Sequence, residues 1–197
     1  MEETTRVLVA GHSFVRRLGV HLKSEGRTLD CEEASVAIYG LGGAKIVGKR
    51  AFFPLVNQYM CDQKPYDMLF LDLGSNDLNK GVNLQELAQE YFVEIDRLVR
   101  SHPMKRVVVC TPIPKTSGKF PHSWDITQRF NLELKRQVAK GPENVRLWSH
   151  KGLFKKGGDT LHADGVHLSR KGMERYFHSL RAGVRKHACE QGHLRSW

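Results

Sequence analysis

Five short apolar runs divide the chain and are typical of buried strands. They cover residues 6–10, 31–38, 68–73, 106–111 and 145–148. Runs of this length are what strands of a parallel sheet require, because both faces of such a sheet are covered. We therefore expect five strands, separated by longer amphipathic segments.

Apolar residues at steps of three and four positions predict helices between and after these runs. The clearest stripe lies in residues 84–100 and consists of Leu84, Leu87, Tyr91, Ile95, Leu98 and Val99. A second stripe consists of Ile126, Phe130, Leu134 and Val138. We also expect a helix over 14–23, one within 42–59 that Gly48 and Pro54 interrupt, and a last helix capped by Ser169.

Strands that alternate with helices predict an α/β fold, here a three-layer α/β/α sandwich around a five-stranded parallel sheet, of flavodoxin-like type. A length of 197 residues fits a single domain, which we expect over residues 1–197. Ligands of such sheets bind at the carboxyl ends of the strands. Ser13, Gly43 and Asn76 would emerge there, and residues 155–158 are expected to form a mobile loop.

The charge of the chain favours anionic partners. Its 31 Lys and Arg residues exceed its 21 Asp and Glu residues, which gives a formal net charge of +10. Such a field attracts nucleic acid, an acidic lipid surface or a negatively charged substrate. The excess is steepest in the expected C-terminal helix and tail, residues 169–197, where a solvated helix face explains it equally well.

The four cysteines are widely separated and show no Cys-x-x-Cys spacing, so neither a zinc knuckle nor a disulfide framework is indicated. The first residues, Met-Glu-Glu-Thr-Thr, lack the features of a signal peptide, and no apolar run is long enough to span a membrane. We therefore expect a protein of the cytoplasm or nucleus that is not secreted and whose membrane contacts, if it makes any, are peripheral.

Gly11-His12-Ser13 follows the first apolar run, and we interpret it as a strand that ends in a tight turn presenting a hydroxyl. If a helix begins there, its positive end and its free N–H groups would stabilise negative charge near Ser13. A serine at this place is also an ordinary helix N-cap. It indicates a nucleophile only in company with a base and with oxyanion donors.

Two further turns offer such donors. Asn76, in Gly74-Ser75-Asn76-Asp77, carries an amide that can donate to an oxyanion. Gly43 has no side chain, so its backbone N–H can approach a substrate oxygen closely. Each segment is explained equally well as a tight turn without a chemical role.

Asp164 precedes His167 by three residues, which lets the carboxylate accept from one ring nitrogen while the other nitrogen faces a serine. Two alternatives remain at this point. His162, Asp164 and His167 could bind a metal ion, or the segment could be a surface turn. His162 could also act as the base, although its place before Asp164 gives it no matching carboxylate.

Together these segments resemble the SGNH, or GDSL-type, hydrolase family over about residues 6–180. The four matching blocks are Gly11-His12-Ser13, Gly40-Leu41-Gly42-Gly43, Gly74-Ser75-Asn76-Asp77 and Asp164-Gly165-Val166-His167-Leu168. The resemblance implies that Ser13 is the nucleophile, His167 the general base and then acid, and Asp164 the carboxylate that orients it. It further implies that the backbone N–H groups of Ser13 and Gly43 and the side chain of Asn76 form the oxyanion hole, with no cofactor and no metal.

The chain departs from the family pattern at two positions. His12 replaces the usual acidic residue before the serine, and Gly42 stands where the glycine block often has serine. The first change removes a carboxylate that would support the turn. Neither change removes a reacting group.

The size of the chain is similar to that of small acetylhydrolases, which implies short-chain, acetyl-type esters of lipids or sugars as substrates. The basic surface also resembles the esterase domains of first-open-reading-frame proteins of some non-LTR retrotransposons, from which this chain could be an excised domain. An alternative from another class is a weakly active or inactive module of the same fold. It would bind nucleic acid or anionic lipid through Arg16, Arg17, Lys45, Lys49 and Arg50.

Overall fold

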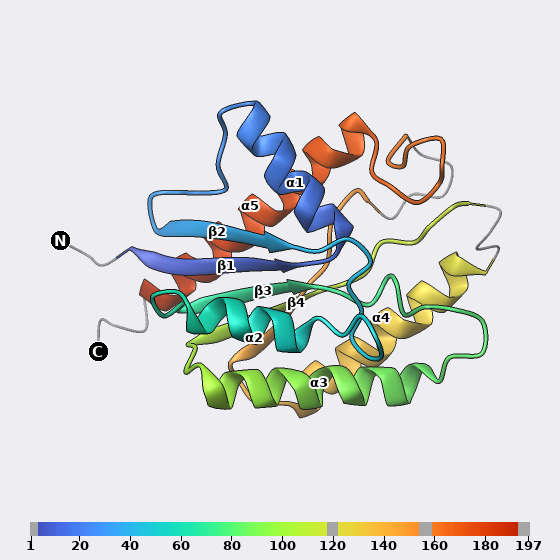
Figure 1. Cartoon of the computed structure of the whole chain (residues 1–197), viewed down its shortest axis with the longest axis horizontal. Coiled ribbons are helices and arrows are strands. Elements are labelled where there is room, and N and C mark those ends of the chain that lie inside the picture. The colour runs from blue at the N-terminus through green and yellow to red at the C-terminus, as the bar shows by residue number, and fades with distance from the viewer. Residues whose placement is uncertain (1–3, 118–121, 154–158, 193–197) are drawn as a thin grey trace.

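All five expected strands form one parallel sheet in the order β2-β1-β3-β4-β5 (Figure 1). The computed structural model of the protein describes residues 4–117, 122–153 and 159–192. The strands are β1 (Thr5–Gly11), β2 (Ala34–Gly40), β3 (Met68–Asp72), β4 (Arg106–Cys110) and β5 (Val145–Trp148). The expected α/β class, the parallel sheet and the number of its strands are confirmed.

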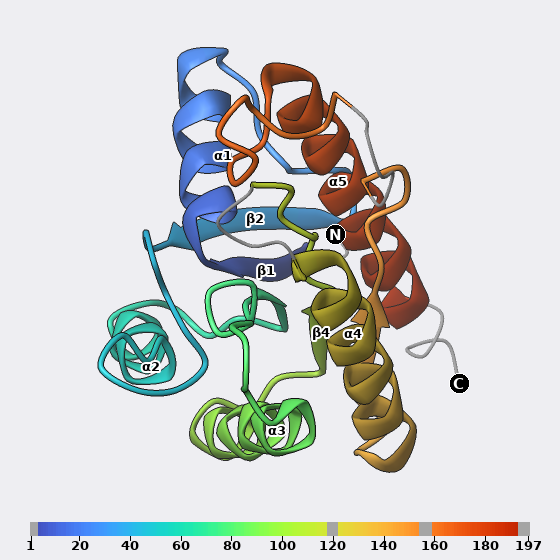
Figure 2. The same cartoon turned by 90° about the vertical axis from the view of Figure 1, so that its right-hand side faces the viewer.

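Helices cover both faces of the sheet, so the three-layer arrangement is also confirmed. The helices are α1 (Ser13–Ser24), α2 (Phe53–Cys61), α3 (Leu84–Ser101), α4 (Ser123–Lys140) and α5 (Arg170–Gly192). Figure 2 shows α1 and α5 on one side of the sheet and α2, α3 and α4 on the other. Within the described residues, no helix combines the length and the apolar character needed to cross a membrane.

The alternation of side chains along each strand divides the core into two apolar clusters. In β1, Leu8 and Ala10 pack with residues of α2, α3 and α4. Val7 and Val9 face the opposite way and pack with residues of α1 and α5. Strands β3 and β4 are buried at every position and β1 at every position but Arg6, which explains their unbroken apolar runs, whereas the outer strands β2 and β5 are partly exposed.

Two expected boundaries were wrong. The strand predicted over 31–38 begins only at Ala34, because Cys31 and Ala34 exchange backbone hydrogen bonds of 3.0 and 3.2 Å in a tight turn. The helix expected within 42–59 covers only the end of that range, since Pro54 lies in the first turn of α2. A helix tolerates proline there, where its missing N–H would have no partner, so Pro54 begins the helix instead of interrupting it.

The helix predicted over 84–100 and the Ser169 cap are confirmed. The helix is α3, and the N–H of Gly172 donates to the Ser169 hydroxyl at 3.0 Å before the first turn of α5. The mobile loop expected at 155–158 lies outside the described residues.

The carboxyl ends of three neighbouring strands stand level with one another. Gly11 at the end of β1 is paired in register with Gly40 of β2 and with Asp72 of β3. The chain continues from these three positions to Ser13, Gly43 and Asn76 within two to four residues. The register therefore brings all three turns to one edge of the sheet, as the sequence predicted.

Candidate active site

Ser13 is the first residue of α1, and His12 is the residue that caps the helix. The Nδ1 atom of His12 accepts a hydrogen bond of 3.3 Å from the N–H of Phe14. The ordinary explanation of Ser13 as a helix cap is thereby excluded, because another side chain performs that role. The Ser13 side chain is half-buried at the positive end of a helix whose first turn contains no acidic residue.

The backbone N–H groups of Ser13 and Gly43 are both available as donors. Among the described residues, neither N–H is hydrogen-bonded to any acceptor. Buried or half-buried N–H groups are nearly always paired in folded proteins, so two unbonded groups on neighbouring turns are unusual. They are the two backbone donors that the resemblance to the SGNH family implies for an oxyanion hole.

Asn76 is held in one orientation by contacts at both ends of its amide. Its Nδ2 donates to the carbonyl oxygen of Ala44 at 3.0 Å, and its Oδ1 lies 3.5 Å from the Nζ of Lys115. One of the two amide hydrogens is engaged by Ala44, and the second can donate to a substrate. The same contact ties the turn of Asn76 to the loop that contains Gly43.

Asp77 fixes these two segments more firmly. Both of its carboxylate oxygens accept from the N–H of Ile46, at 3.2 and 3.0 Å. Burial raises the pKa of Asp77, although the backbone bonds from Ile46 and Val47 act in the opposite direction. Asp77 is therefore a structural link between the second and third turns of the site.

Asp164 holds His167 through three contacts. Its Oδ2 lies 2.6 Å from Nδ1 of the ring, and its Oδ1 accepts from the N–H groups of Val166 and His167 at 2.8 and 2.9 Å. The N–H of His167, its ring and the N–H of Val166 together hold the pKa of Asp164 well below its usual value. The carboxylate is thus ionised, and Nε2 is the ring nitrogen left to act on another group.

A short hairpin-like segment carries this pair. Leu161 and Leu168 form an antiparallel bridge, and the N–H of His162 donates to the carbonyl of His167 at 2.7 Å. Gly165 at its tip has a φ of +64°, and a β-carbon there would collide with the backbone of Ser117. Its carbonyl also accepts from the N–H of Thr116 at 2.8 Å, which fastens the tip to the chain that follows β4.

The structure brings several of the predicted site residues together, but its described residues show no hydrogen bond between Ser13 and His167. Asp164 and His167 are paired, and Asn76 and Gly43 line the same hollow. The segment leading into α5 lies on the side of the sheet where α1 begins (Figures 1 and 2). Among the described residues, no hydrogen bond joins the Ser13 hydroxyl to His167. That contact stays a prediction, and such pairs are often long in enzymes without substrate.

Asp72 is a buried charged residue that the sequence did not single out. It ends β3, is 2% exposed, and its backbone carbonyl accepts from the N–H of His12 at 3.1 Å. Its carboxylate accepts from the hydroxyl of Tyr176 and lies 3.4 Å from Nε2 of His12. The family pattern has an acidic residue directly before the serine. In this chain the carboxylate next to that position comes instead from Asp72, on the neighbouring strand β3.

His150 completes this buried network. Its Nδ1 lies 3.0 Å from the Ser179 hydroxyl, and its Nε2 lies 4.0 Å from the Asp72 carboxylate. Burial lowers the pKa of His150 to about 4, so the ring is neutral near pH 7. Burial alone would raise the pKa of Asp72, but the nearby imidazoles and the Tyr176 hydroxyl hold it below its usual value. An acidic residue in an otherwise apolar run was the available signal, because such residues are rarely buried without partners.

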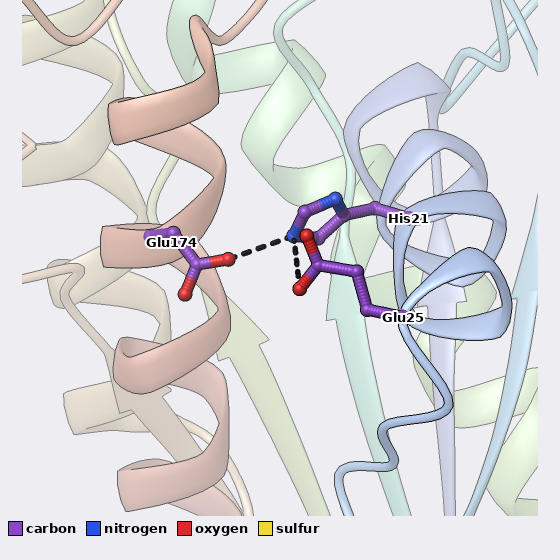
Figure 3. Close-up of side chains that lie close together, drawn as sticks. All are labelled: His21, Glu25 and Glu174. Atoms are coloured by element: carbon purple, nitrogen blue, oxygen red, sulfur yellow. Dashed lines mark hydrogen bonds and ion pairs between the residues drawn. The ribbon is translucent and has the colours of Figure 1, made fainter.

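The metal alternative finds no support in the described residues. Their one group of three potential ligands is His21, Glu25 and Glu174, and the His162 segment does not form such a group. Figure 3 shows His21 between the two carboxylates, 2.8 Å from Glu174 and 3.6 Å from Glu25. Arg27 also binds both carboxylates, at 2.8 and 2.9 Å, so their charge is already compensated. We interpret this cluster as an ion-pair network between α1 and α5.

Comparisons with known proteins agree with this fold and show the family of the chain. The model of the GDSL-like lipase/acylhydrolase family matches residues 6–175. An aryl esterase from M. smegmatis, in its inhibitor-bound form, has a similar fold with a TM-score of 0.72 and 15% identity, over 93% of this chain and 99% of that one. A carbohydrate acetylesterase from Sinorhizobium meliloti has a TM-score of 0.71 and 15% identity, also over 93% of this chain and 99% of that one.

A third structure, a carbohydrate esterase family 3 protein from Talaromyces cellulolyticus, has a TM-score of 0.65 and 16% identity, over 95% of this chain and 99% of that one. At such identities the likeness concerns the fold alone. No curated protein sequence is significantly similar to the chain. The narrower resemblance to retrotransposon proteins finds no support in these comparisons.

Proposed function

Because the chain belongs to the GDSL-like lipase/acylhydrolase family, we propose that it is a serine esterase that hydrolyses short-chain, acetyl-type esters of sugars or lipids. The main observation behind the proposal is the contact between Oδ2 of Asp164 and Nδ1 of His167, at 2.6 Å, which leaves Nε2 of the ring to act as a base. A carboxylate that fixes the ring in this way is the arrangement by which serine hydrolases orient their base.

The proposed reaction is a two-step acyl transfer. His167 takes the proton of the Ser13 hydroxyl, and the serine oxygen attacks the ester carbonyl. His167 then protonates the departing alcohol, which leaves the acyl group on Ser13. Water, deprotonated by His167, releases the acid and restores the serine.

Negative charge develops on the carbonyl oxygen in both steps. The unbonded N–H groups of Ser13 and Gly43 and the second amide hydrogen of Asn76 are the proposed donors to it. Donors that are fixed before the reaction stabilise the transition state without having to reorganise. The contacts of Asn76 with Ala44 and Lys115 support this role, because they hold the amide in place.

The preference for short acyl chains is supported by one of the proteins of similar fold, a carbohydrate acetylesterase. A rate profile over esters of increasing acyl length tests it. An acetyl ester should be hydrolysed fastest, and a maximum at long chains would identify a lipase instead.

The nucleophile is tested by labelling and by substitution. A serine-reactive organophosphonate should modify Ser13, and Ser13→Ala should lower the hydrolysis of an aryl acetate by roughly 10⁴-fold or more. Ser24→Ala, at the other end of the same helix, is the matched control and should leave the rate unchanged. An adduct elsewhere together with an unchanged rate in Ser13→Ala would refute the proposed mechanism.

A further inference from the structure

A groove of about 530 Å³ adjoins the proposed oxyanion donors and is strongly basic. Gly43 and Asn76 line it together with four cationic side chains, those of Lys45, Lys49, Arg50 and Lys115. We call it the basic groove. Cavities of roughly 300–1,000 Å³ suit small-molecule ligands, and an acetyl group would fill only a small part of this one. The remaining space is available for the alcohol part of an ester.

The positive charge of the basic groove is only partly compensated. Elsewhere on the surface, Arg97 and Arg136 are paired with glutamates at 2.5 Å. Within the described part of the chain, no ion pair of this kind involves Lys49 or Arg50, and both side chains are exposed. The buried carboxylate of Asp77 interacts electrostatically with Lys45 and Lys115. Among the described residues, Lys49 and Arg50 therefore give the exposed side of the groove an excess of positive charge.

The loop that carries three of these cations is held in place by its own backbone. The N–H of Lys45 donates to the carbonyl of Arg50, and the N–H of Phe52 donates to the carbonyl of Lys45, both at 2.9 Å. The guanidinium of Arg50 lies so close to Gly43 that a β-carbon at position 43 would collide with it. The cation therefore stands directly beside one of the proposed oxyanion donors.

Lys115 reaches the same groove from the chain that follows β4. Its Nζ donates to the carbonyl of Ser75 at 2.8 Å and lies 3.5 Å from Oδ1 of Asn76. Burial lowers the pKa of Lys115, while the Asp77 carboxylate acts to raise it. Cations from two separate segments thus converge on the residues that would bind the reacting carbonyl.

We infer that the esterase prefers acetyl esters whose alcohol part carries an anionic group, a carboxylate or a phosphate, and that the basic groove binds this group. The inference rests on the proposed function, since it assigns the substrate class of the same site. Cations in a groove attract anionic ligands and raise their local concentration. Exposed lysine and arginine side chains bind carboxylate and phosphate alike, so the test must include both.

The test compares esters that differ in charge but little in shape. The esters are para-acetoxybenzamide, which is neutral, para-acetoxybenzoate and para-acetoxyphenyl phosphate, and each enzymatic rate is divided by the rate of hydrolysis in hydroxide alone. We expect kcat/KM for at least one anionic ester to exceed that for the amide by roughly tenfold at low salt. The ratio should fall towards one as the salt concentration rises, because salt screens exposed charges.

Substitutions then locate the effect. Lys49→Gln and Arg50→Gln should each lower the ratio of anionic to neutral kcat/KM by about two- to fivefold, the range for one exposed charge. Lys140→Gln makes the same change of charge at the far end of α4, and should leave the ratio unchanged. The ratio is the informative quantity, since Arg50 also lies beside Gly43, one of the proposed oxyanion donors.

The outcomes separate the inference from the proposed function. Hydrolysis of the neutral ester without a preference for either anion would overturn the inference and keep the esterase. A preference that Lys140→Gln lowers as much as Lys49→Gln would also overturn it, because the effect would then come from net charge. If none of the three esters is hydrolysed, both the proposed function and the inference fail.

Discussion

Asn76 shows how a side chain in a turn is held in one orientation by its neighbours. An isolated asparagine amide rotates freely and can present either its oxygen or its nitrogen to a ligand. Here Ala44 accepts from Nδ2 and Lys115 lies against Oδ1, so the nitrogen end is fixed next to Gly43. The side chain is therefore preorganised as a donor.

Removing this donor should slow catalysis more than it weakens substrate binding. We expect Asn76→Ala to cost about 3 kcal/mol of transition-state stabilisation, mostly as a loss of kcat, because one oxyanion donor is worth that amount. Steady-state kinetics with an aryl acetate measures the division between kcat and KM. A rise in KM with kcat unchanged would show that Asn76 binds the substrate without acting on the oxyanion.

Residues that are close in sequence were the easiest to predict. The contact between Asp164 and His167 follows from a spacing of three residues and a single turn. Lys115 could not be connected with Asn76 in this way, because 39 positions separate them and the contact depends on how β4 lies beside β3. Residue patterns therefore identify local pairs, and the sheet determines which distant side chains join them.

At the scale of elements, the cluster between α1 and α5 is a candidate for a pH-dependent contact. Glu174 of α5 faces His21, Glu25 and Arg27, and His178 lies 3.9 Å away on its own helix. The hydrogen bond from Arg27, followed by that from His21, lowers the pKa of Glu174 to about 2. Since the ordinary value is near 4.5, the folded state favours the ionised carboxylate.

This shift gives the contact a defined pH window. A carboxyl group with a lowered pKa in the folded state stabilises the fold above its ordinary pKa, and the contribution disappears as the pH falls towards the lowered value. We expect Glu174→Gln to lower the free energy of unfolding by about 1 kcal/mol at pH 7, a figure reduced for partial exposure. The difference from the unaltered protein should shrink below about pH 4.5 and vanish near pH 2.

Urea unfolding at several pH values measures this difference. Glu133→Gln removes a glutamate from an ordinary pair with Arg136 on α4, and should change the free energy of unfolding by only about 0.3 kcal/mol. A difference for Glu174→Gln that stayed constant down to pH 2 would show that the lost stability does not come from the charge.

Element boundaries illustrate why pattern alone is not sufficient. All five apolar runs became strands. The three central strands are buried on both faces, while the outer strands β2 and β5 are partly exposed. The helix predicted within 42–59 was wrong for the first part of that range. There the Asp77 carboxylate accepts from the N–H of Ile46 and holds the chain as a loop against the turn that contains Asn76. This contact joins two residues that are 31 positions apart in the sequence, so no local sequence pattern could predict it.

At the scale of the whole molecule, the Asp72 network connects four separate parts of the fold. Asp72 ends β3, His12 follows β1, Tyr176 belongs to α5, and His150 follows β5. All four side chains are buried. The Asp72 carboxylate thus lies among polar groups from segments as far as 104 positions away in the sequence, and the Tyr176 hydroxyl donates to it.

The energetic consequence follows from the cost of burying an unpaired charge. Asp72→Ala and His12→Ala should each lower the free energy of unfolding by about 3–5 kcal/mol, because each leaves a buried polar partner without its counterpart. Asp62→Ala, at an exposed carboxylate after α2, is the control and should change it by no more than about 0.5 kcal/mol.

The double variant distinguishes a coupled network from two independent buried groups. If His12 and Asp72 stabilise the fold through each other, the loss in the double variant should be smaller than the sum of the single losses by at least about 1 kcal/mol. Urea unfolding at pH 7 of the four proteins gives this coupling energy directly, and Asp72→Asn serves if an alanine variant does not fold. Additive losses would mean that the two side chains are buried near each other without a shared interaction. The support for Ser13 would then come from the His12 cap of α1 alone, since the carboxylate of β3 would contribute nothing to it.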